Sequence, residues 1–437
     1  MRMFKGYERT DEDGNPMVYE VTNPLFGAPP AGNCWEASLN ATIDALGATK
    51  SLALSSVFHA RTDGLTTRIG TIVDDLIVTL ERSTAGRDLA TFIMSHVSEA
   101  YGGEVRWDYD PPTFSFGGVQ VVRDIPRRAV TMKIEMKIAD AVANYAPHLV
   151  GSTRVVEHVA SQANLDLLVL PPADARGKLS KAQELIREET GLLVWFAEYF
   201  VHTAVPTHHL TTVMAFPPVE PARAVLNEVW AYMNSHKHEG NTFGGELTDY
   251  SGVECQAACT PLELPPIAEC VLSTDAGWTG SEQRSRKAYA IKWQGGTIMH
   301  RLSTIHACMP SSFMAEAEAL HDGVEAGDYV VDALVEFGHL GSSEVLTLGD
   351  NEGLVKTVRL KAKGGSKFHR RKITIICERL ERKRYNVRHI STEQMPVDFM
   401  TKLIGKKKHR ASIKYLYNLG NLVATGAPAP AEPSVVG

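Results

Sequence analysis

Four acidic residues of this chain stand where an open α/β sheet would gather carboxylates around metal ions: Asp275, Glu316, Asp350 and Asp398. Asp275 and Asp350 each follow a short apolar run, so both fall at the carboxyl ends of predicted strands, where open sheets hold their ligands. Asp398 comes directly after a proline and a valine, at the predicted start of a helix. Carboxylates without paired histidine or cysteine suit hard, oxygen-preferring cations, Mg²⁺ or Mn²⁺. Such metal chemistry is most often performed on phosphodiesters.

The choice of Glu316 over its neighbour Glu318 rests on helical periodicity. Residues 311–320 begin with two serines and have the pattern of a capped helix. The apolar residues that follow recur at about 100° per residue and define one face. On that periodicity Glu316 lies about 70° from the centre of the apolar face, and Glu318 lies about 130° away. We therefore expect Glu316 to lean over the sheet edge and Glu318 to point into solvent.

Length and composition are those of an ordinary globular protein. The chain has 437 residues, of which 44% are hydrophobic and 22% charged, and its formal net charge is -6. This length predicts two or three domains, and the negative net charge argues against a basic surface over the whole protein, so any basic surface must be local. Six cysteines in so long a chain indicate reduced thiols, and no apolar run reaches membrane-spanning length. We expect a soluble intracellular protein, cytoplasmic or nuclear, without a membrane partner.

The pattern along the chain divides it into successive blocks. Residues 1–125 mix short strands with one helix, and helical periodicity dominates residues 126–245. The irregular, proline-bearing segment 246–266 is the expected linker. Strands and helices alternate over residues 267–405. A basic stretch and then an Ala/Pro-rich tail, expected to be disordered, follow at residues 406–437.

A second pair of acids, Asp74 and Asp75, lies between two strand-like apolar runs at residues 68–73 and 76–79. A tight hairpin turn prefers Asn-Gly or Asp-Gly, because its backbone needs positive φ. Two adjacent aspartates also repel each other, which makes sense if a cation binds there. A surface turn without metal explains the pair about as well, so both interpretations stay open.

Basic residues are concentrated between the last two acids of the four. From Val355 to Tyr385 the sequence has twelve Lys or Arg against two Glu. A solvated helix face is the usual explanation of such a run, but its position beside the acidic cluster favours contact with phosphates. The residues expected to bind nucleic acid are Lys356, Lys363, Lys367, Arg370, Arg371 and Lys372.

Two other features are expected to be structural. The histidines at 208–209 and 236–238 lack flanking ligands at helical spacing, so we expect them on the surface rather than at a metal. The aromatic stripe at residues 195–200 is expected to pack in a helical core rather than to stack on bases. Neither feature changes the site expected at the four carboxylates.

In their order along the chain, these motifs resemble the carboxyl-terminal part of a copia-type retrotransposon polyprotein, a reverse transcriptase followed by a ribonuclease H. The resemblance runs from Val18 to Lys402. Tyr19–Trp35 is similar to the family's segment of leucine, tyrosine, glycine, leucine, lysine and glutamine before a tryptophan. Ile72–Asp75 is similar to the polymerase motif that ends in two aspartates. Ser273–Gly280 is similar to the start of the ribonuclease H domain, whose three later motifs match at residues 315–318, 349–351 and 392–402.

The resemblance implies cleavage of the RNA strand of an RNA–DNA hybrid. The four carboxylates would hold two Mg²⁺ ions about 3.5–4 Å apart, with Asp275 as the bridging ligand. One ion would lower the pKa of the attacking water, and the other would stabilise the departing 3′ oxygen. The implied fold is α/β. It comprises a truncated reverse-transcriptase palm over 1–125, a helical thumb and connection over 126–245, and a mixed five-stranded sheet flanked by helices over 267–405.

Departures from the family pattern bear on which activities are retained. The reverse-transcriptase part begins after the palm strand that carries the first catalytic aspartate, so we expect Asp74 and Asp75 to be vestigial polymerase ligands. In the ribonuclease H part, residues 313–315 read Phe-Met-Ala where the family has Ser-Ser-Thr. The alternative to a nuclease is therefore a non-catalytic, nucleic-acid-binding remnant. Other parts of the polyprotein are possible partners, one of which would supply the missing palm strand.

Overall fold

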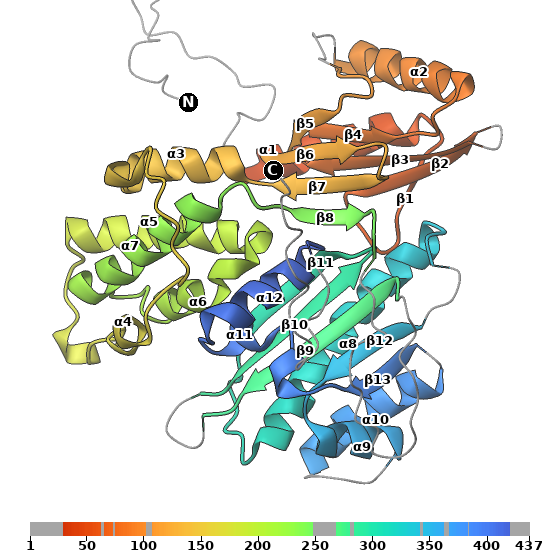
Figure 1. The fold of residues 1–437 in the computed structure, drawn as a ribbon. Helices are drawn as coiled ribbons and strands as arrows, with labels where there is room; N and C mark the ends of the chain where they lie inside the picture. The colour runs from red at the N-terminus through yellow and green to blue at the C-terminus, as the bar shows by residue number, and fades with distance from the viewer. Residues whose placement is uncertain are drawn as a thin grey trace, which may run out of the picture. The chain divides into compact units, whose positions relative to one another are not determined.

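The computed structural model describes residues 29–62, 65–72, 75–101, 107–247, 268–279, 284–340, 344–361, 367–382 and 384–419 (Figure 1). The chain divides into two compact units, Met1–Tyr109 and Asp110–Gly437. Three segments for which the sequence makes predictions lie outside the described residues. They are the motif segment up to residue 28, most of the expected linker (248–266) and the Ala/Pro-rich tail from residue 420.

The first unit contains a four-stranded antiparallel sheet in the order β1-β2-β3-β4. Its elements are α1 (Pro29–Asp44), β1 (Thr49–Lys50), β2 (Val57–Thr62), β3 (Leu65–Ile72), β4 (Asp75–Thr79) and α2 (Thr84–Tyr101). Leu39 and Ile43 of α1 share one buried core with Phe58 and Ile69 of the sheet. Burial of these apolar side chains holds the unit together.

The predicted hairpin around the two aspartates is present. β3 and β4 pair antiparallel, and Ile72 lies opposite Asp75 at the end of the ladder. Asp75 is exposed, and Asp74 lies outside the described residues. A metal-binding role for this pair therefore stays a prediction.

A second antiparallel sheet, in the order β5-β6-β7-β8, belongs to the second unit. Its strands are β5 (Thr113–Phe116), β6 (Val119–Asp124), β7 (Ala129–Lys133) and β8 (Asn241–Gly244). Because β6 and β7 pair with each other, the block boundary expected at residue 125 falls inside a hairpin, and the first compact unit ends earlier, at Tyr109. β8 comes from the far side of the helical block, a long-range pairing that local sequence patterns do not reveal.

Helices fill the chain between β7 and β8, as the periodicity predicts. They are α3 (Glu135–Tyr145), η1 (Pro147–Leu149), α4 (Gln162–Asp166), η2 (Ala173–Ala175), α5 (Lys181–Tyr199), η3 (Val201–Thr203), α6 (Ala204–Thr212) and α7 (Val219–His236). Val225, Val229 and Trp230 of α7 are fully buried, in the same core as Phe196 and Phe200. The core packing predicted for the aromatic stripe is thus confirmed for its two phenylalanines.

The part of the second unit that bears the four carboxylates is a mixed five-stranded sheet in the order β11-β10-β9-β12-β13. Its elements are β9 (Cys270–Gly277), β10 (Arg286–Trp293), β11 (Gly296–Thr304), α8 (Ser312–Glu336), β12 (Val345–Gly349), α9 (Glu352–Arg359), α10 (Lys367–Glu381), β13 (Tyr385–His389), η4 (Thr392–Gln394), α11 (Asp398–Thr401) and α12 (Lys406–Leu416). β9, β10 and β11 are antiparallel, whereas β12 is parallel to both β9 and β13. The predicted α/β class and the mixed five-stranded sheet are confirmed.

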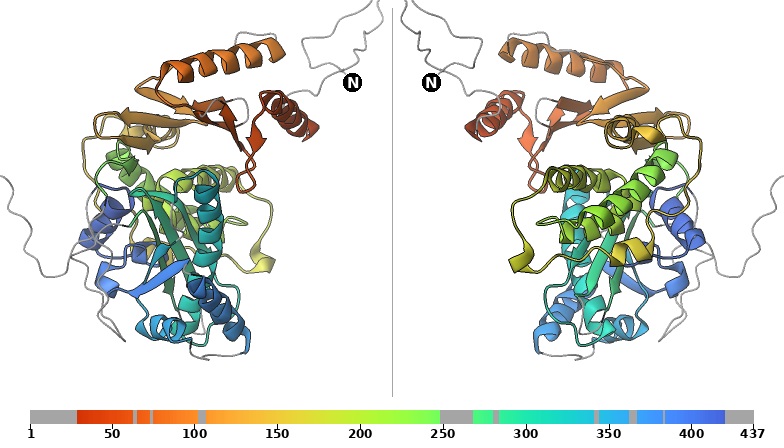
Figure 2. Two further views of the ribbon diagram at one scale, coloured as in Figure 1. Left: turned by 90° about the vertical axis from the view of Figure 1, so that its right-hand side faces the viewer. Right: turned by 90° about the vertical axis from the view of Figure 1, so that its left-hand side faces the viewer.

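Helices lie on both faces of this sheet (Figures 1 and 2). Leu272 of β9 packs with Leu320 of α8, whereas its neighbour Val271 packs with Ile413 of α12. Successive side chains of a strand point to opposite faces, so a strand covered on both sides carries a continuous apolar run. This explains the run that leads to Asp275. None of the helices in the described part of the chain is long and apolar enough to cross a membrane.

Candidate metal centre

Asp275 lies inside the central strand of the sheet rather than after its end. β9 continues to Gly277, because Asp275 still pairs with Ala288 of β10. Its carboxylate is buried, and its Oδ2 accepts a hydrogen bond from Thr401 Oγ1. Gly277 makes room for this partner, since a Cβ atom there would lie 3.2 Å from the Thr401 carbonyl oxygen. Thr401, in the helix α11 that packs on β9, thus orients Asp275.

Glu316 enters the site from the start of α8. The helix begins as predicted, with Ser311 Oγ accepting from the backbone N–H of Met314 at 3.4 Å. Glu316 is buried, and its Oε1 accepts from the backbone N–H of Ala276 at 3.2 Å. The close approach of α8 to β9 depends on Gly323, where a Cβ atom would lie 2.8 Å from Thr274 Cγ2. The predicted position of Glu316 over the sheet is therefore what the structure shows.

Asp350 is the first residue after β12, as predicted, at the carboxyl end of a parallel strand. Its Oδ2 accepts a hydrogen bond from Thr392 Oγ1 at 2.8 Å, and its carbonyl oxygen lies 3.0 Å from His389 Nε2. The next residue, Asn351, caps α9 by accepting from the Leu354 N–H at 2.9 Å. The chain turns from β12 into α9 at this cap, which leaves the Asp350 side chain half-buried at the end of the strand.

Three of the four predicted acids come together. Asp275, Glu316 and Asp350 each offer a carboxylate oxygen, and these oxygens all lie within 4.8 Å of one another. Burial raises the pKa of Asp275 to about 7, and the carboxylates of Asp350 and Asp398 add to the rise. Burial also raises the pKa of Glu316 well above its ordinary value, followed by the charges of Asp275 and Asp350. Three carboxylates at this separation, two of them buried, offer oxygen ligands that fit a hard divalent cation such as Mg²⁺ or Mn²⁺.

Asp398 lies next to this trio but is engaged differently. It is the first residue of the four-residue helix α11 and is 1% exposed. Its two carboxylate oxygens form ion pairs with Lys402 and Lys408. Neither belongs to the group of oxygens from Asp275, Glu316 and Asp350 that lie within 4.8 Å of one another. Its charge nevertheless raises the pKa of Asp275, so the fourth acid lies within electrostatic reach of the trio. Sequence analysis did not single out these two lysines, although the spacing of Lys402 four residues after Asp398 is that of a helical ion pair.

The prediction that Glu318 points into solvent is wrong. Glu318 is 5% exposed and forms ion pairs with Lys287 of β10, at 3.8 Å, and with Lys372 of α10. Periodicity identified the apolar face that α8 packs against the sheet. It did not show that α10 packs on a second face of the same helix.

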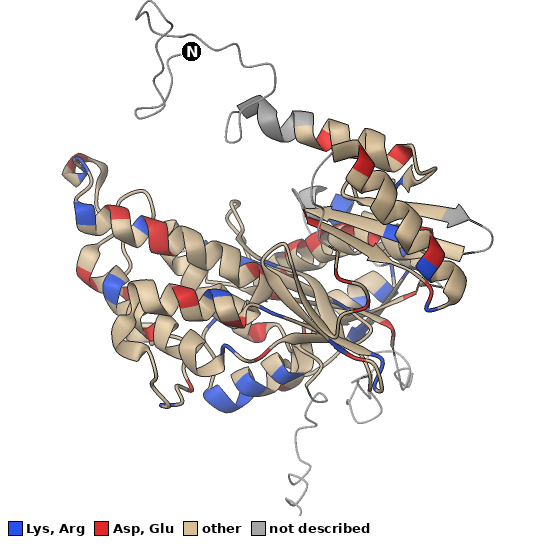
Figure 3. Ribbon diagram, turned by 90° about the horizontal axis from the view of Figure 1, so that it is seen from above, with Lys and Arg blue, Asp and Glu red and all other residues tan. Residues whose placement is uncertain are grey.

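The predicted nucleic-acid contacts have different environments. Arg370 and Arg371, near the start of α10, are exposed, and basic residues are blue in Figure 3. Lys372 pairs with Glu318, and Lys356 pairs with Glu352 at 2.7 Å along α9. Lys363 and the side chain of Lys367 lie outside the described part of the chain. Contact with nucleic acid stays a prediction for all six residues.

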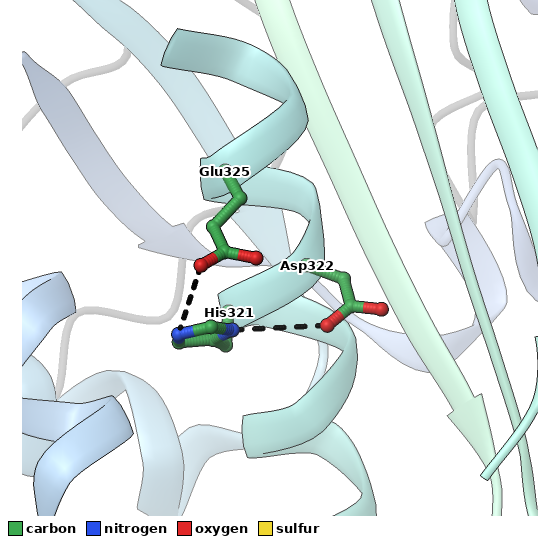
Figure 4. A group of neighbouring side chains, drawn as sticks. All are labelled: His321, Asp322 and Glu325. Atoms are coloured by element: carbon green, nitrogen blue, oxygen red, sulfur yellow. Dashed lines mark ion pairs between the residues drawn. The ribbon is translucent and has the colours of Figure 1, made fainter.

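A second group of possible metal ligands lies further along α8 (Figure 4). His321 Nδ1 is 3.7 Å from Asp322 Oδ1, and His321 Nε2 is 3.5 Å from Glu325 Oε1. One ligand atom from each of the three residues lies within 4.8 Å of the others, the same spacing as in the group around Asp275. Asp322 is also paired with Lys287 at 2.5 Å. The His321 group therefore differs from the group around Asp275 in its partners, because its carboxylates form ion pairs with His321 and Lys287.

The histidines expected on the surface differ in exposure: His238 is exposed, His208 and His209 are half-buried, and His236 is buried. His236 is 8% exposed, with Nδ1 2.8 Å from Glu239 Oε1 and Nε2 2.9 Å from the Val156 carbonyl oxygen. Burial lowers the pKa of both His208 and His209 to about 4. These residues lie where helices pack on neighbouring elements, so a polar residue type was a poor guide to exposure.

No protein-family model and no curated protein matches this sequence. Among solved structures, the chain is similar to LC11-RNase H1, isolated from compost by a metagenomic approach. That match has 23% identity and a TM-score of 0.24, and it covers 29% of this chain and 86% of the other. LC11-RNase H1 in complex with an RNA/DNA hybrid matches at 22% identity and a TM-score of 0.24, over 29% and 88% of the two chains. A prototype foamy virus protease–reverse transcriptase matches at 12% identity and a TM-score of 0.24, over 78% of this chain and 43% of the other.

Proposed function

We propose that residues 267–405 form a ribonuclease H-type endonuclease that cleaves the RNA strand of RNA–DNA hybrids, using Mg²⁺ or Mn²⁺. One observation carries this proposal: carboxylate oxygens from β9, α8 and the residue after β12 lie within 4.8 Å of one another, near the carboxyl ends of two neighbouring strands of a mixed sheet. Asp275, Glu316 and Asp350 would hold the metal, with Asp398 as the fourth ligand. Bound divalent ions would generate the attacking water nucleophile and neutralise charge on the departing oxygen.

The chain's own contribution is orientation of the acids before metal arrives. Hydrogen bonds from Thr401, the Ala276 N–H and Thr392 each fix one oxygen of Asp275, Glu316 and Asp350 respectively. Partners of this kind hold ligands in place, and their loss typically costs about 10–100-fold in metal affinity or activity. The raised pKa values of Asp275 and Glu316 mean that metal binding must release protons.

The substrate proposal rests on charge and on the order of the sequence motifs. Exposed Arg370 and Arg371 would contact phosphates of the hybrid, and contacts to the 2′-hydroxyl would distinguish RNA from DNA. The motif order from Ile72 to Lys402 supports an origin in a copia-type element. Ile72 stands where the polymerase motif of such elements has a tyrosine, and we propose that Asp74 and Asp75 support no polymerase activity.

One structural observation favours the alternative of a non-catalytic, nucleic-acid-binding remnant. Met314 and Ala315, which stand where the family has polar residues, pack in an apolar cluster with Ala276 and Met309 directly beside Glu316. The hydroxyl groups that would support the helix carboxylate are therefore replaced by buried carbon. Loss of such support could leave binding intact while slowing cleavage.

Cleavage of a labelled RNA–DNA hybrid by the purified full chain with Mg²⁺ tests the proposal. Asp350→Asn removes one ligand charge, and Asp174→Asn, on the exposed turn η2, is a matched control for the same change. Cleavage by the wild type and the control, but not by Asp350→Asn, is the expected result. A folded wild type that binds hybrid without cutting it would establish the remnant instead.

A further inference from the structure

Two lysines neutralise Asp398 from different parts of the chain. Lys402 follows α11 and pairs with Oδ1, whereas Lys408 comes from α12 and pairs with Oδ2. Oδ1 of Asp398 is buried and lies in direct contact with the Lys402 ammonium. Another cation can therefore bind this oxygen only in place of the Lys402 ammonium.

The two lysines are held to different degrees. Lys408 Nζ also donates to the Thr392 carbonyl oxygen at 2.6 Å, and its side chain is 19% exposed. Lys402 is 51% exposed and lies just beyond the helix, at a residue with an extended backbone. Lys408 is thus anchored at two points beside the Thr392 that orients Asp350, whereas the Lys402 ammonium has a path into solvent.

The Lys402 ammonium also interacts electrostatically with the other acids of the cluster. Burial by itself would lower the pKa of Lys402, but the pairing with Asp398 and the charges of Asp275 and Asp350 raise it. The same ammonium lowers the pKa values of Asp275 and Glu316, opposing the larger effects that raise them. Lys402 is therefore positioned to counter charge on all four acids.

We propose that Lys402 is the resident cation of the acidic cluster and that a divalent ion must displace its ammonium from Asp398 in order to bind. This inference rests on the metal centre of the proposed function and adds its regulation. Displacement frees Asp398 Oδ1 to join the oxygens of Asp275, Glu316 and Asp350. Lys408 remains in place and keeps the Asp398 carboxylate oriented. Metal affinity is then set by competition between one ammonium and one divalent ion for the same oxygen.

Titration of the metal-free full chain with Mn²⁺, followed by calorimetry and thermal stabilisation, tests this competition without any catalytic readout. Lys402→Met removes the charge and keeps the length of the side chain, so we expect Mn²⁺ binding to tighten by about 5-fold or more, the lower end of ordinary coupling between two binding events. Lys402→Arg keeps the charge and should retain wild-type affinity. Lys406→Met is a matched control, because that ammonium pairs with exposed Glu157 at 2.5 Å.

The outcomes separate this inference from the proposed function. Wild-type binding of Mn²⁺ that is lost in Asp350→Asn, with unchanged or weaker affinity in Lys402→Met, would overturn the role of Lys402 alone. Absence of Mn²⁺ binding in both the wild type and Lys402→Met would overturn the metal centre itself. Tighter binding in Lys402→Met, with Lys406→Met unchanged, supports the competition.

Discussion

Helix α8 carries two groups of carboxylates whose charges are balanced in different ways. At its start, Glu316 faces Asp275 and Asp350, and no described Lys, Arg or His forms an ion pair with any of these three. Only two residues later, Glu318 pairs with Lys287 and Lys372. Asp275, Glu316 and Glu318 are all buried, so burial does not distinguish the two groups; the presence of a cationic partner does.

The comparison shows how a buried acid can be assigned a role. Removing a carboxylate from water is costly, and the cost is offset when the chain supplies a cation in good geometry. Glu318 receives its cations from β10 and α10, so it contributes to packing of α8. Asp275, Glu316 and Asp350 lack such pairs, and the pKa values of Asp275 and Glu316 are raised, so we propose that a cation from solution completes this group.

Removal of a charge from the uncompensated group should have the largest effect. We expect Asp275→Asn to lower hybrid cleavage by more than about 100-fold, because it removes a ligand and not merely a supporting hydrogen bond. The variant should also lose the thermal stabilisation that Mn²⁺ gives to the wild type. Metal-induced stabilisation that survives in Asp275→Asn would place the ion elsewhere in the chain.

The pH dependence of metal-free stability should follow the raised pKa of Asp275. This pKa is about 7 in the folded chain, against an ordinary value of 3.8. The folded state then binds more protons than the unfolded state between these values, so the stabilisation from this group is complete below about pH 4 and is lost as pH rises through about 7. The loss is on the order of a few kcal/mol.

Urea unfolding in the presence of a chelator measures this trend. Across pH 4 to 8, the wild type should lose stability relative to Asp275→Asn, which has no proton to release at that position. Saturating Mg²⁺ should abolish the difference in slope by binding the ionised form. Parallel pH curves for the two proteins would show that Asp275 does not titrate in this window.

Two glutamates of α8 should respond with opposite signs to the same substitution. Glu318→Gln leaves Lys287 and Lys372 without their partner, so we expect a loss of about 2 kcal/mol in the free energy of unfolding, less than for a fully buried pair. Glu316→Gln removes a charge from a repulsive cluster and should stabilise the metal-free protein. Urea unfolding at pH 8 with a chelator gives both values, and a loss in both variants would contradict the comparison.

The difference between these two glutamates also shows which contacts could be predicted from the sequence and which could not. Strand ends and the helix phase placed Glu316 and Asp350 correctly, because apolar periodicity reports which face an element turns to its first partner. Periodicity does not show which further element packs on another face of the same helix. The contacts of Glu318 with α10 and of Asp398 with Lys408 were therefore missed. The pairing of β7 with β8 was missed for the same reason, since it depends on segments separated by the whole helical block.

The ion-pair network around His321 provides the smallest expected effect and the sharpest test of the contrast. Glu325 is 57% exposed, so its contact with His321 is screened by solvent and contributes little. Glu325→Gln should therefore change the free energy of unfolding by no more than about 0.5 kcal/mol and leave Mn²⁺ binding unaltered. Calorimetric titration of this variant beside Asp350→Asn checks the point directly. A weaker Mn²⁺ affinity in Glu325→Gln would mean that the network binds metal, and that a partner in the chain is not sufficient to exclude a cation from solution.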